Sequence, residues 1–222
     1  MSKSVYSLVL IDELVDKVDR EAYALNTNRS NLINRIIAEH FSIATPEQKL
    51  REIFDIVEQR LKEAEELKIK AQQSDATMAV HSALKYKYNP TIRYSIELYK
   101  EREDVVGELK VSFRTQNKHL ISDITTFFML WAKMEKKYIE KYFPEKQVIL
   151  QIKDGKLIRK FIVPKEEKYR TNDQIGKAIT KYIESLDRII KIYFNDIDDL
   201  QLAKVEMEKA YIEYLNNEAI II

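Results

Sequence analysis

The stretch Lys3–Asp19, KSVYSLVLIDELVDKVD, changes its hydrophobic period part of the way along. In residues 5–10, VYSLVL, large apolar residues at the even positions alternate with Val, Ser and Val at the odd positions. This period of two is typical of a half-buried strand. From Asp12, which we expect to cap a helix, the period becomes helical. The apolar positions of that helix are Leu14, Val18, Ala22 and Leu25.

A second short helix is predicted directly after the first. The segment 26–28, Asn-Thr-Asn, interrupts the first helix, because asparagine favours turns and caps. Asn28 is then expected to cap the second helix. The apolar face of this helix carries Leu32, Ile33, Ile36, Ile37 and Phe41.

One strand and two short helices do not bury this much apolar surface by themselves. A segment of about 45 residues lies near the lower size limit for an independent core. A lone strand also leaves both of its edges without hydrogen-bond partners. We therefore expect a second copy of the chain, whose residues 5–10 pair with those of the first across a two-fold axis.

Residues 3–43, about a fifth of the chain, resemble the ribbon-helix-helix DNA-binding proteins of the Arc and MetJ type. The resemblance implies a βαα fold in an intertwined homodimer, whose two-stranded ribbon enters the major groove of double-stranded DNA. It also implies that the start of the second helix holds a backbone phosphate. Carried over by position, the base-facing residues are Lys3, Val5, Ser7 and Val9. The phosphate-facing residues are Asn28, Arg29 and Ser30.

The chain departs from the usual family pattern in two ways. Family members often carry Arg, Lys, Gln or Thr on the outward strand face, whereas Val5 and Val9 can only touch a thymine methyl group, and Ser7 bonds to any base. Residues 1–45 carry five Lys and Arg against six Asp and Glu, a net charge of −1. Since non-specific DNA affinity depends on Lys and Arg, we expect binding to be weak or assisted by the rest of the chain. The alternative is that this segment is a dimerisation unit only.

The composition describes a globular protein with much exposed surface. Of the 222 residues, 45% are hydrophobic and 33% are charged. A run of about 18 apolar residues, which a membrane span requires, is absent. There is no cysteine, which excludes disulfides and thiolate zinc sites. The expected location is the cytoplasm, without a membrane partner.

Residues 45–89 are expected to form a helical linker between a domain of residues 1–44 and a domain of residues 90–222. Thr45 can cap a helix whose first turn begins at Pro46. In residues 47–71 the apolar positions Leu50, Phe54, Val57, Leu61 and Ala64 have heptad spacing. This seam predicts either a coiled coil between two chains or packing on the chain's own C-terminal domain. Ser74 or Asp75 is expected to cap a further short helix that reaches Leu84.

The C-terminal domain is expected to be α+β, with the order ββαββα plus a final helix. Alternating residues in 91–99 and 106–113 predict a first hairpin, and a helix follows from Leu120 to about Phe143. Asp154-Gly155, between the strands 147–152 and 156–163, is a strong hairpin signal. Thr171 is expected to cap the next helix, and the last helix covers roughly 198–215. The expected architecture is a four-stranded antiparallel sheet with helices on one face.

No catalytic, cofactor-binding or metal-binding constellation is found. The three glycines are scattered and form no phosphate-binding loop. His40, His81 and His119 are far apart, so no histidine pair has metal-ligand spacing. Trp131 and its neighbouring phenylalanines are expected to form core rather than a ligand pocket. An enzyme is therefore not expected.

The expected function is that of a sequence-specific, repressor-like transcriptional regulator that binds DNA as a homodimer, with higher oligomers on repeated sites. Its C-terminal domain would bind a small-molecule or protein effector, or extend the oligomer. Two alternatives use the same N-terminal segment: a plasmid partition or conjugation accessory protein, and an antitoxin-like protein-interaction module.

Overall fold

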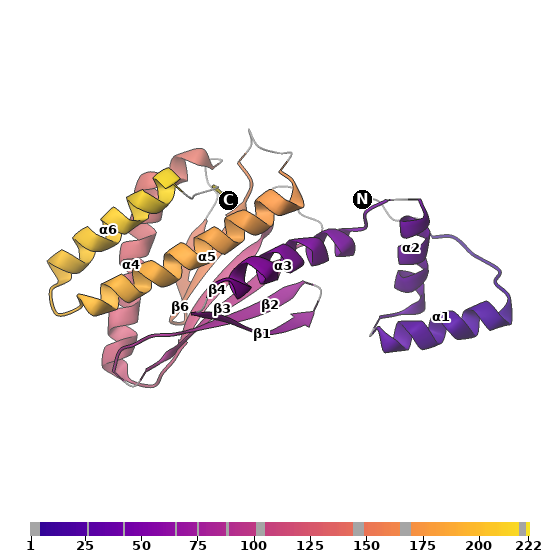
Figure 1. Ribbon diagram of the computed structural model, residues 1–222, viewed down its shortest axis with the longest axis horizontal. Coiled ribbons are helices and arrows are strands. Elements are labelled where there is room, and N and C mark those ends of the chain that lie inside the picture. The colour runs from indigo at the N-terminus through magenta and orange to yellow at the C-terminus, as the bar shows by residue number, and fades with distance from the viewer. Residues whose placement is uncertain are drawn as a thin grey trace. The chain divides into compact units, whose positions relative to one another are not determined.

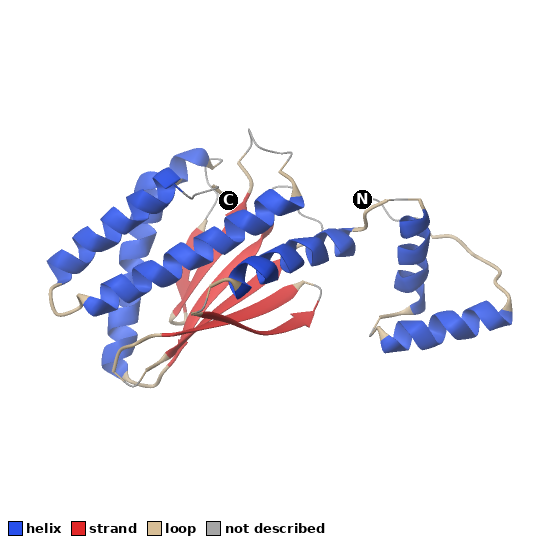
Figure 2. Ribbon diagram, in the orientation of Figure 1, coloured by secondary structure: helices blue, strands red, loops and turns tan. Residues whose placement is uncertain are grey.

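The computed structural model describes residues 5–25, 27–41, 43–64, 66–74, 76–87, 89–100, 105–143, 149–164, 170–217 and 221–222. The chain divides into two compact units, residues 1–49 and 50–222. Figure 1 labels the elements, and Figure 2 distinguishes the helices from the strands.

The first unit contains two helices, α1 (Asp12–Ala24) and α2 (Arg29–His40). Asn28 caps α2 as predicted, and its side chain accepts a hydrogen bond from the Asn31 N–H. The prediction for α1 was wrong in detail: Ile11 is the N-cap and makes no side-chain cap bond, while Asp12 is the first helical residue. Its carboxylate still interacts favourably with the helix dipole in the first turn. Residues 5–11 form no strand within the single chain.

The second unit is an antiparallel sheet covered by helices on one side (Figure 2). The strand order is β1-β2-β3-β4-β6-β5. Its helices and strands are α3 (Pro46–Lys62, which begins in the first unit), β1 (Leu67–Ser74), β2 (Thr77–Ala83), β3 (Thr91–Leu98), β4 (Val105–Arg114), α4 (Lys118–Tyr138), β5 (Leu150–Lys153), β6 (Lys156–Ile162), α5 (Asn172–Asn195) and α6 (Leu200–Asn217). A short 3-10 turn, Glu140–Tyr142, follows α4.

The α+β class and both predicted hairpins are confirmed, but the sheet has six strands in the described residues rather than four. The helix expected to run on from Pro46 ends at Lys62, and the short helix expected after Ser74 is wrong. Residues 67–83 instead form the hairpin β1–β2, because pairing of β2 along the whole of β3 outweighs local helix propensity. Asp75, the other cap considered there, and the start of the strand expected from Gln147 lie outside the described residues.

Capping explains where the long helices begin. The Thr45 hydroxyl accepts from the Gln48 N–H at 3.2 Å, and the Gln48 side chain accepts from the Thr45 N–H at 2.7 Å. The same reciprocal box joins Thr171 and Gln174 at the start of α5. Both threonines were predicted as caps, and this arrangement satisfies two backbone N–H groups that a helix start leaves free.

One large core joins the helices of the second unit to one face of its sheet. In β3, Ile92, Tyr94, Ile96 and Leu98 are buried, while the residues between them are not. The heptad positions of α3 (Leu50, Phe54, Val57 and Leu61) belong to the same core. Packing on the chain's own domain is therefore the alternative that the structure favours for α3. At Gly176, a Cβ atom would lie 2.7 Å from Ile56, so the glycine allows α5 to approach α3 closely.

Candidate nucleic-acid interface

Residues 5–10 expose almost all of their side chains to solvent. Val5 and Val9 are fully exposed, and Ser7 lies between them with its side chain exposed. Tyr6 and Leu8, on the alternate positions, are 84% and 62% exposed. Lys3, the fourth residue predicted to face bases, lies outside the described residues. The side chains of residues 5–9 are thus exposed and that of Leu10 is half-buried, with small residues at the odd positions and large apolar residues at the even positions.

The start of α2 is organised around Asn28. Its side-chain oxygen accepts from the Asn31 N–H at 2.9 Å, and its carbonyl accepts from the Leu32 N–H at 3.0 Å. The N–H groups of Arg29 and Ser30, in the first turn, have no partner within the helix. Both side chains are exposed. Such N–H groups, together with the helix dipole, favour an anion at this position.

Arg29 is held by an ion pair that the sequence analysis did not anticipate. Its Nε donates to Asp19 Oδ1 at 2.6 Å, and its Nη2 donates to Asp19 Oδ2. The hydrogen bond from Arg29 lowers the pKa of Asp19, and the same bond raises the pKa of Arg29. This contact joins α1 to the start of α2. The signal in the sequence was a pair of opposite charges ten residues apart, on either side of the predicted break between the two helices.

The first unit exposes an unusual amount of apolar surface. Its buried apolar side chains in residues 5–43 are Val18, Ala22, Leu32 and Ala38. Twelve large hydrophobic side chains in the same stretch are exposed, against eight in the remainder of the described chain. They are Val5, Tyr6, Leu8, Val9, Ile11, Leu14, Tyr23, Leu25, Ile36, Ile37, Phe41 and Ile43. Most of the predicted apolar faces of α1 and α2 therefore point at solvent, and exposed apolar surface of this density marks an interaction site.

The cations of the first unit are mostly paired with carboxylates of the same unit. Besides Arg29 with Asp19, Lys17 lies 3.4 Å from Glu13, and Arg35 Nε lies 3.5 Å from Glu39. The positive charge that this unit can offer to phosphates is correspondingly small.

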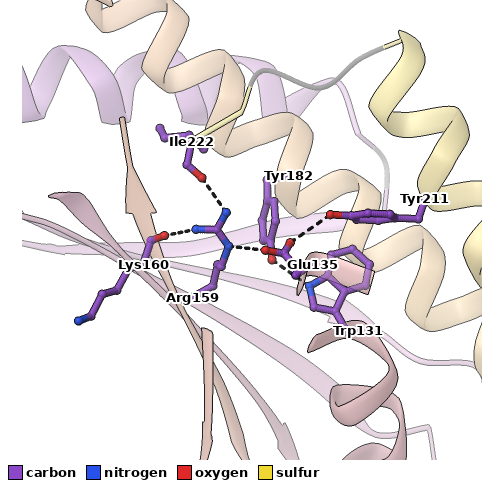
Figure 3. A network of polar contacts seen from close by, with 7 residues as sticks. All are labelled: Trp131, Glu135, Arg159, Lys160, Tyr182, Tyr211 and Ile222. Carbon is purple, nitrogen blue, oxygen red and sulfur yellow. Dashed lines mark hydrogen bonds and ion pairs between the residues drawn. The ribbon is translucent and has the colours of Figure 1, made fainter. Parts of the chain in front are cut away.

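The second unit contains a buried polar network around Arg159 of β6 (Figure 3). Arg159 Nε donates to Glu135 at 2.7 Å, and Nη2 donates to the backbone oxygen of Ile222 at 2.7 Å. Burial alone would lower the pKa of Arg159, but the charge and hydrogen bond of Glu135 raise it. Tyr211 also donates to Glu135, at 3.5 Å. Arg159 and Glu135 are 1% and 4% exposed, so the two side chains are buried in the interior, where their ion pair stabilises the fold.

Trp131 completes this network. Its Nε1–H donates to the Tyr182 hydroxyl at 3.0 Å, and its side chain has no exposed surface. Burial, reinforced by the charge of Glu135, raises the pKa of Tyr182 well above its usual value. The prediction that Trp131 forms core is confirmed.

A polar cavity of about 460 Å³ opens between the β2–β3 connection, the start of α4 and the α5–α6 connection. It is lined by Tyr86, Lys87, Asn117, His119, Leu120, Asp123, Ile197 and Asp198. The cavity is large enough to admit a small molecule, and its lining is polar. The effector expected for the C-terminal domain stays a prediction. Within the described ranges, no three His, Asp or Glu side chains are grouped so that they could hold a metal ion.

None of the helices in the described part of the chain combines the length and the apolar composition that crossing a bilayer would require. Comparison of the chain with protein-family models, with curated proteins and with solved structures found no match.

Proposed function

We propose that this chain is a sequence-reading, DNA-binding regulator of transcription that acts as a homodimer. In the dimer, residues 5–10 of two copies pair as an antiparallel ribbon, and the ribbon enters the major groove. The observation that carries the proposal is the exposure of twelve large apolar side chains in residues 5–43. A surface of this kind in so small a unit requires a partner, and a second copy supplies one that is always present.

The energetics are adequate for a stable dimer. Burying one Val, Leu or Ile side chain contributes roughly 1.5–3 kcal/mol. Covering six of the twelve side chains on each protomer would therefore contribute on the order of 10 kcal/mol per protomer. That gain offsets the roughly 4–15 kcal/mol that association costs.

The two faces of the ribbon have separate roles in this proposal. Tyr6, Leu8 and Leu10 turn inward and pack on the helices of both copies. Val5, Ser7 and Val9 turn outward, where the valines touch thymine methyl groups and the serine hydroxyl bonds to a base edge. This chemistry reads sequence with few hydrogen bonds, so the shape of the groove contributes to the choice of site.

The start of α2 grips the DNA backbone in the same proposal. The free N–H groups of Arg29 and Ser30 donate to a phosphate, together with the Ser30 hydroxyl. A guanidinium has five N–H donors, and Asp19 takes those on the Nε–Nη2 edge of Arg29. Asp19 thereby orients Arg29, whose Nη1 remains for the phosphate.

The test is fluorescence-anisotropy binding of the full chain to DNA from upstream of its own gene and to a scrambled sequence, across a salt series. We expect a specificity ratio above roughly 10³. Replacing Ser7 with alanine should weaken binding to both DNAs by roughly two- to tenfold, since the hydroxyl bonds to any base edge and one hydrogen bond contributes about 0.5–1.5 kcal/mol.

Arg29→Ala should weaken binding to both DNAs about equally and lower the salt slope by about 1, because a phosphate contact carries no sequence information. The matched control is Arg20→Ala, which removes the same charge from the exposed side of α1 and should leave the slope near that of the parent. Unchanged DNA binding in both the Ser7 and the Arg29 variants would contradict the proposed docking.

A further inference from the structure

The sheet of the second unit has one face that its helices do not cover. On this face β3 carries Thr91, Arg93, Ser95 and Glu97, which alternate with its buried residues. The strand register places Arg93 beside His81 of β2 and Ser112 of β4, and it places Lys68 of β1 beside His81. Thr91 lies beside Arg114. Residues far apart in the sequence thus meet on one surface.

Charge on this open face is segregated along the strands. At one end, Lys110 lies 3.2 Å from Glu97 and 2.7 Å from Glu108, so the lysine there is paired with carboxylates. At the other end stand Lys68, Lys70, Arg93 and Arg114, all exposed. Among the residues that the structure describes, none of these four forms an ion pair. We call these four residues the basic end of the sheet.

The surroundings of the basic end are small and polar rather than apolar. The register neighbours of its two arginines are Thr91, His81 and Ser112. Adjacent strands lie about 4.8 Å apart and residues rise about 3.3 Å along a strand, so neighbouring cations are spaced roughly 7–10 Å apart. Extended Lys and Arg side chains at that spacing can reach successive charges of a polyanion. An apolar protein partner would find no complementary surface there.

We propose that the basic end of the sheet is a second DNA contact, which binds the phosphate backbone of the duplex that the N-terminal unit reads. This inference rests on the proposed function. It supplies what the first unit lacks, because residues 1–45 carry a net charge of −1 and their cations are largely paired. Four unpaired cations per protomer, eight per dimer, provide the electrostatic affinity, while the ribbon provides the sequence preference.

The test compares two variants of the full chain with the same change in net charge. The sheet variant is K68Q/K70Q/R93Q/R114Q, and the control is K133Q/K136Q/K177Q/K209Q, whose four lysines are exposed on helices. Binding to the upstream and scrambled duplexes is measured by anisotropy across a salt series. We expect the sheet variant to lower the salt slope by about 3 to 4 per protomer, at about 0.9 per phosphate. Its specificity ratio should be unchanged, and the control should match the parent chain.

A conservative variant distinguishes the loss of positive charge from a loss of folding. R93K/R114K keeps both charges, so it should bind with the parental salt slope. R93Q/R114Q removes two of the four charges, so it should lower the salt slope by about half as much as the sheet variant does. A sheet variant that binds both duplexes like the control would overturn the inference and leave the proposed function standing. Failure of the parent chain to bind either duplex would overturn both. If the sheet variant lost binding to phosphatidylserine vesicles while its DNA binding stayed unchanged, the inference would be overturned. The basic end of the sheet would then bind an anionic membrane surface instead of DNA.

His81 offers an independent readout of the same contact. Burial lowers its pKa, and the charges of Lys70 and Arg93 lower it further; Lys68 is its other charged neighbour in the register. A phosphate beside these cations would offset their field, so the pKa of His81 should rise when DNA binds. Nuclear magnetic resonance titration of the imidazole signals, with and without scrambled duplex, measures this. His119, on α4, serves as the control, and an unmoved His81 in the presence of saturating DNA would overturn the inference.

Discussion

A chain in which Leu8 is replaced by glutamate should be monomeric and should lose DNA binding by more than about a thousandfold. Leu8 is 62% exposed in the single chain and lies on the apolar face of residues 5–10. In the proposed dimer it is buried twice, once for each copy. Each lost leucine contributes roughly 2 kcal/mol, and each buried carboxylate adds a further penalty. Together they exceed the roughly 4 kcal/mol that corresponds to a thousandfold change.

Val9→Glu is the matched control for this experiment, because Val9 is the next residue and faces the other way. It should leave the dimer intact and weaken only DNA binding, since its carboxylate would face phosphates. Sedimentation equilibrium measures the dimer, and anisotropy measures the DNA complex. A dimeric Leu8→Glu chain, or equal loss of dimer in both variants, would falsify the proposed ribbon.

Replacing Glu135 with alanine should lower the free energy of unfolding of the second unit by about 3–5 kcal/mol, the usual cost of breaking a buried ion pair. The cause is Arg159, which is 1% exposed and would keep a buried charge without its carboxylate. Urea unfolding followed by fluorescence measures the change. Trp131 is the single tryptophan of the chain and belongs to this network, so its emission reports directly on the site.

The double variant Glu135→Leu with Arg159→Met provides the control. Replacing both partners of a buried ion pair by apolar residues is often neutral or stabilising, so most of the lost stability should return. A single Glu135→Ala variant that unfolds within about 1 kcal/mol of the parent chain would contradict a structural role for the pair.

Local signals predicted the parts of the fold that local chemistry determines. Thr45, Asn28 and Thr171 cap helices where their side chains can reach free N–H groups. The turn at Asp154-Gly155 has positive φ at both residues, 51° and 68°, as a tight hairpin turn requires. These features depend on residues within a few positions of one another, so they can be predicted from the sequence alone.

The hairpin β1–β2 was missed because its sequence is locally ambiguous. Residues 67–74, LKIKAQQS, are rich in Lys, Ala and Gln, which favour helices. Their alternation at Leu67 and Ile69 becomes decisive only when β2 and β3 supply hydrogen-bond partners. The basic end of the sheet was missed for the same reason. Lys68 was expected in a helix, and only the strand register brings it toward Arg93.

The candidate site in the first unit could be predicted in part. The Asn28 cap followed from the residue type, whereas the Arg29–Asp19 pair depends on how α1 and α2 fold against each other. The pairing of residues 5–10 depends on another copy of the chain, so it lies beyond what one chain can display. It stays a prediction for the dimerisation experiment.

The two edges of the sheet have a consequence for solubility. An exposed edge strand is a template for aggregation unless the protein blocks it. β1 forms one edge, and its pairing with β2 is irregular between Ile69 and Ala71 and again between Gln72 and Ser74. Lys70 lies at the first irregularity, and bulges and lysines both discourage a further strand. β5, the other edge, is only four residues long. Both edges of the sheet therefore discourage the second unit from pairing its strands with those of neighbouring molecules, and the chain should stay soluble at high concentration.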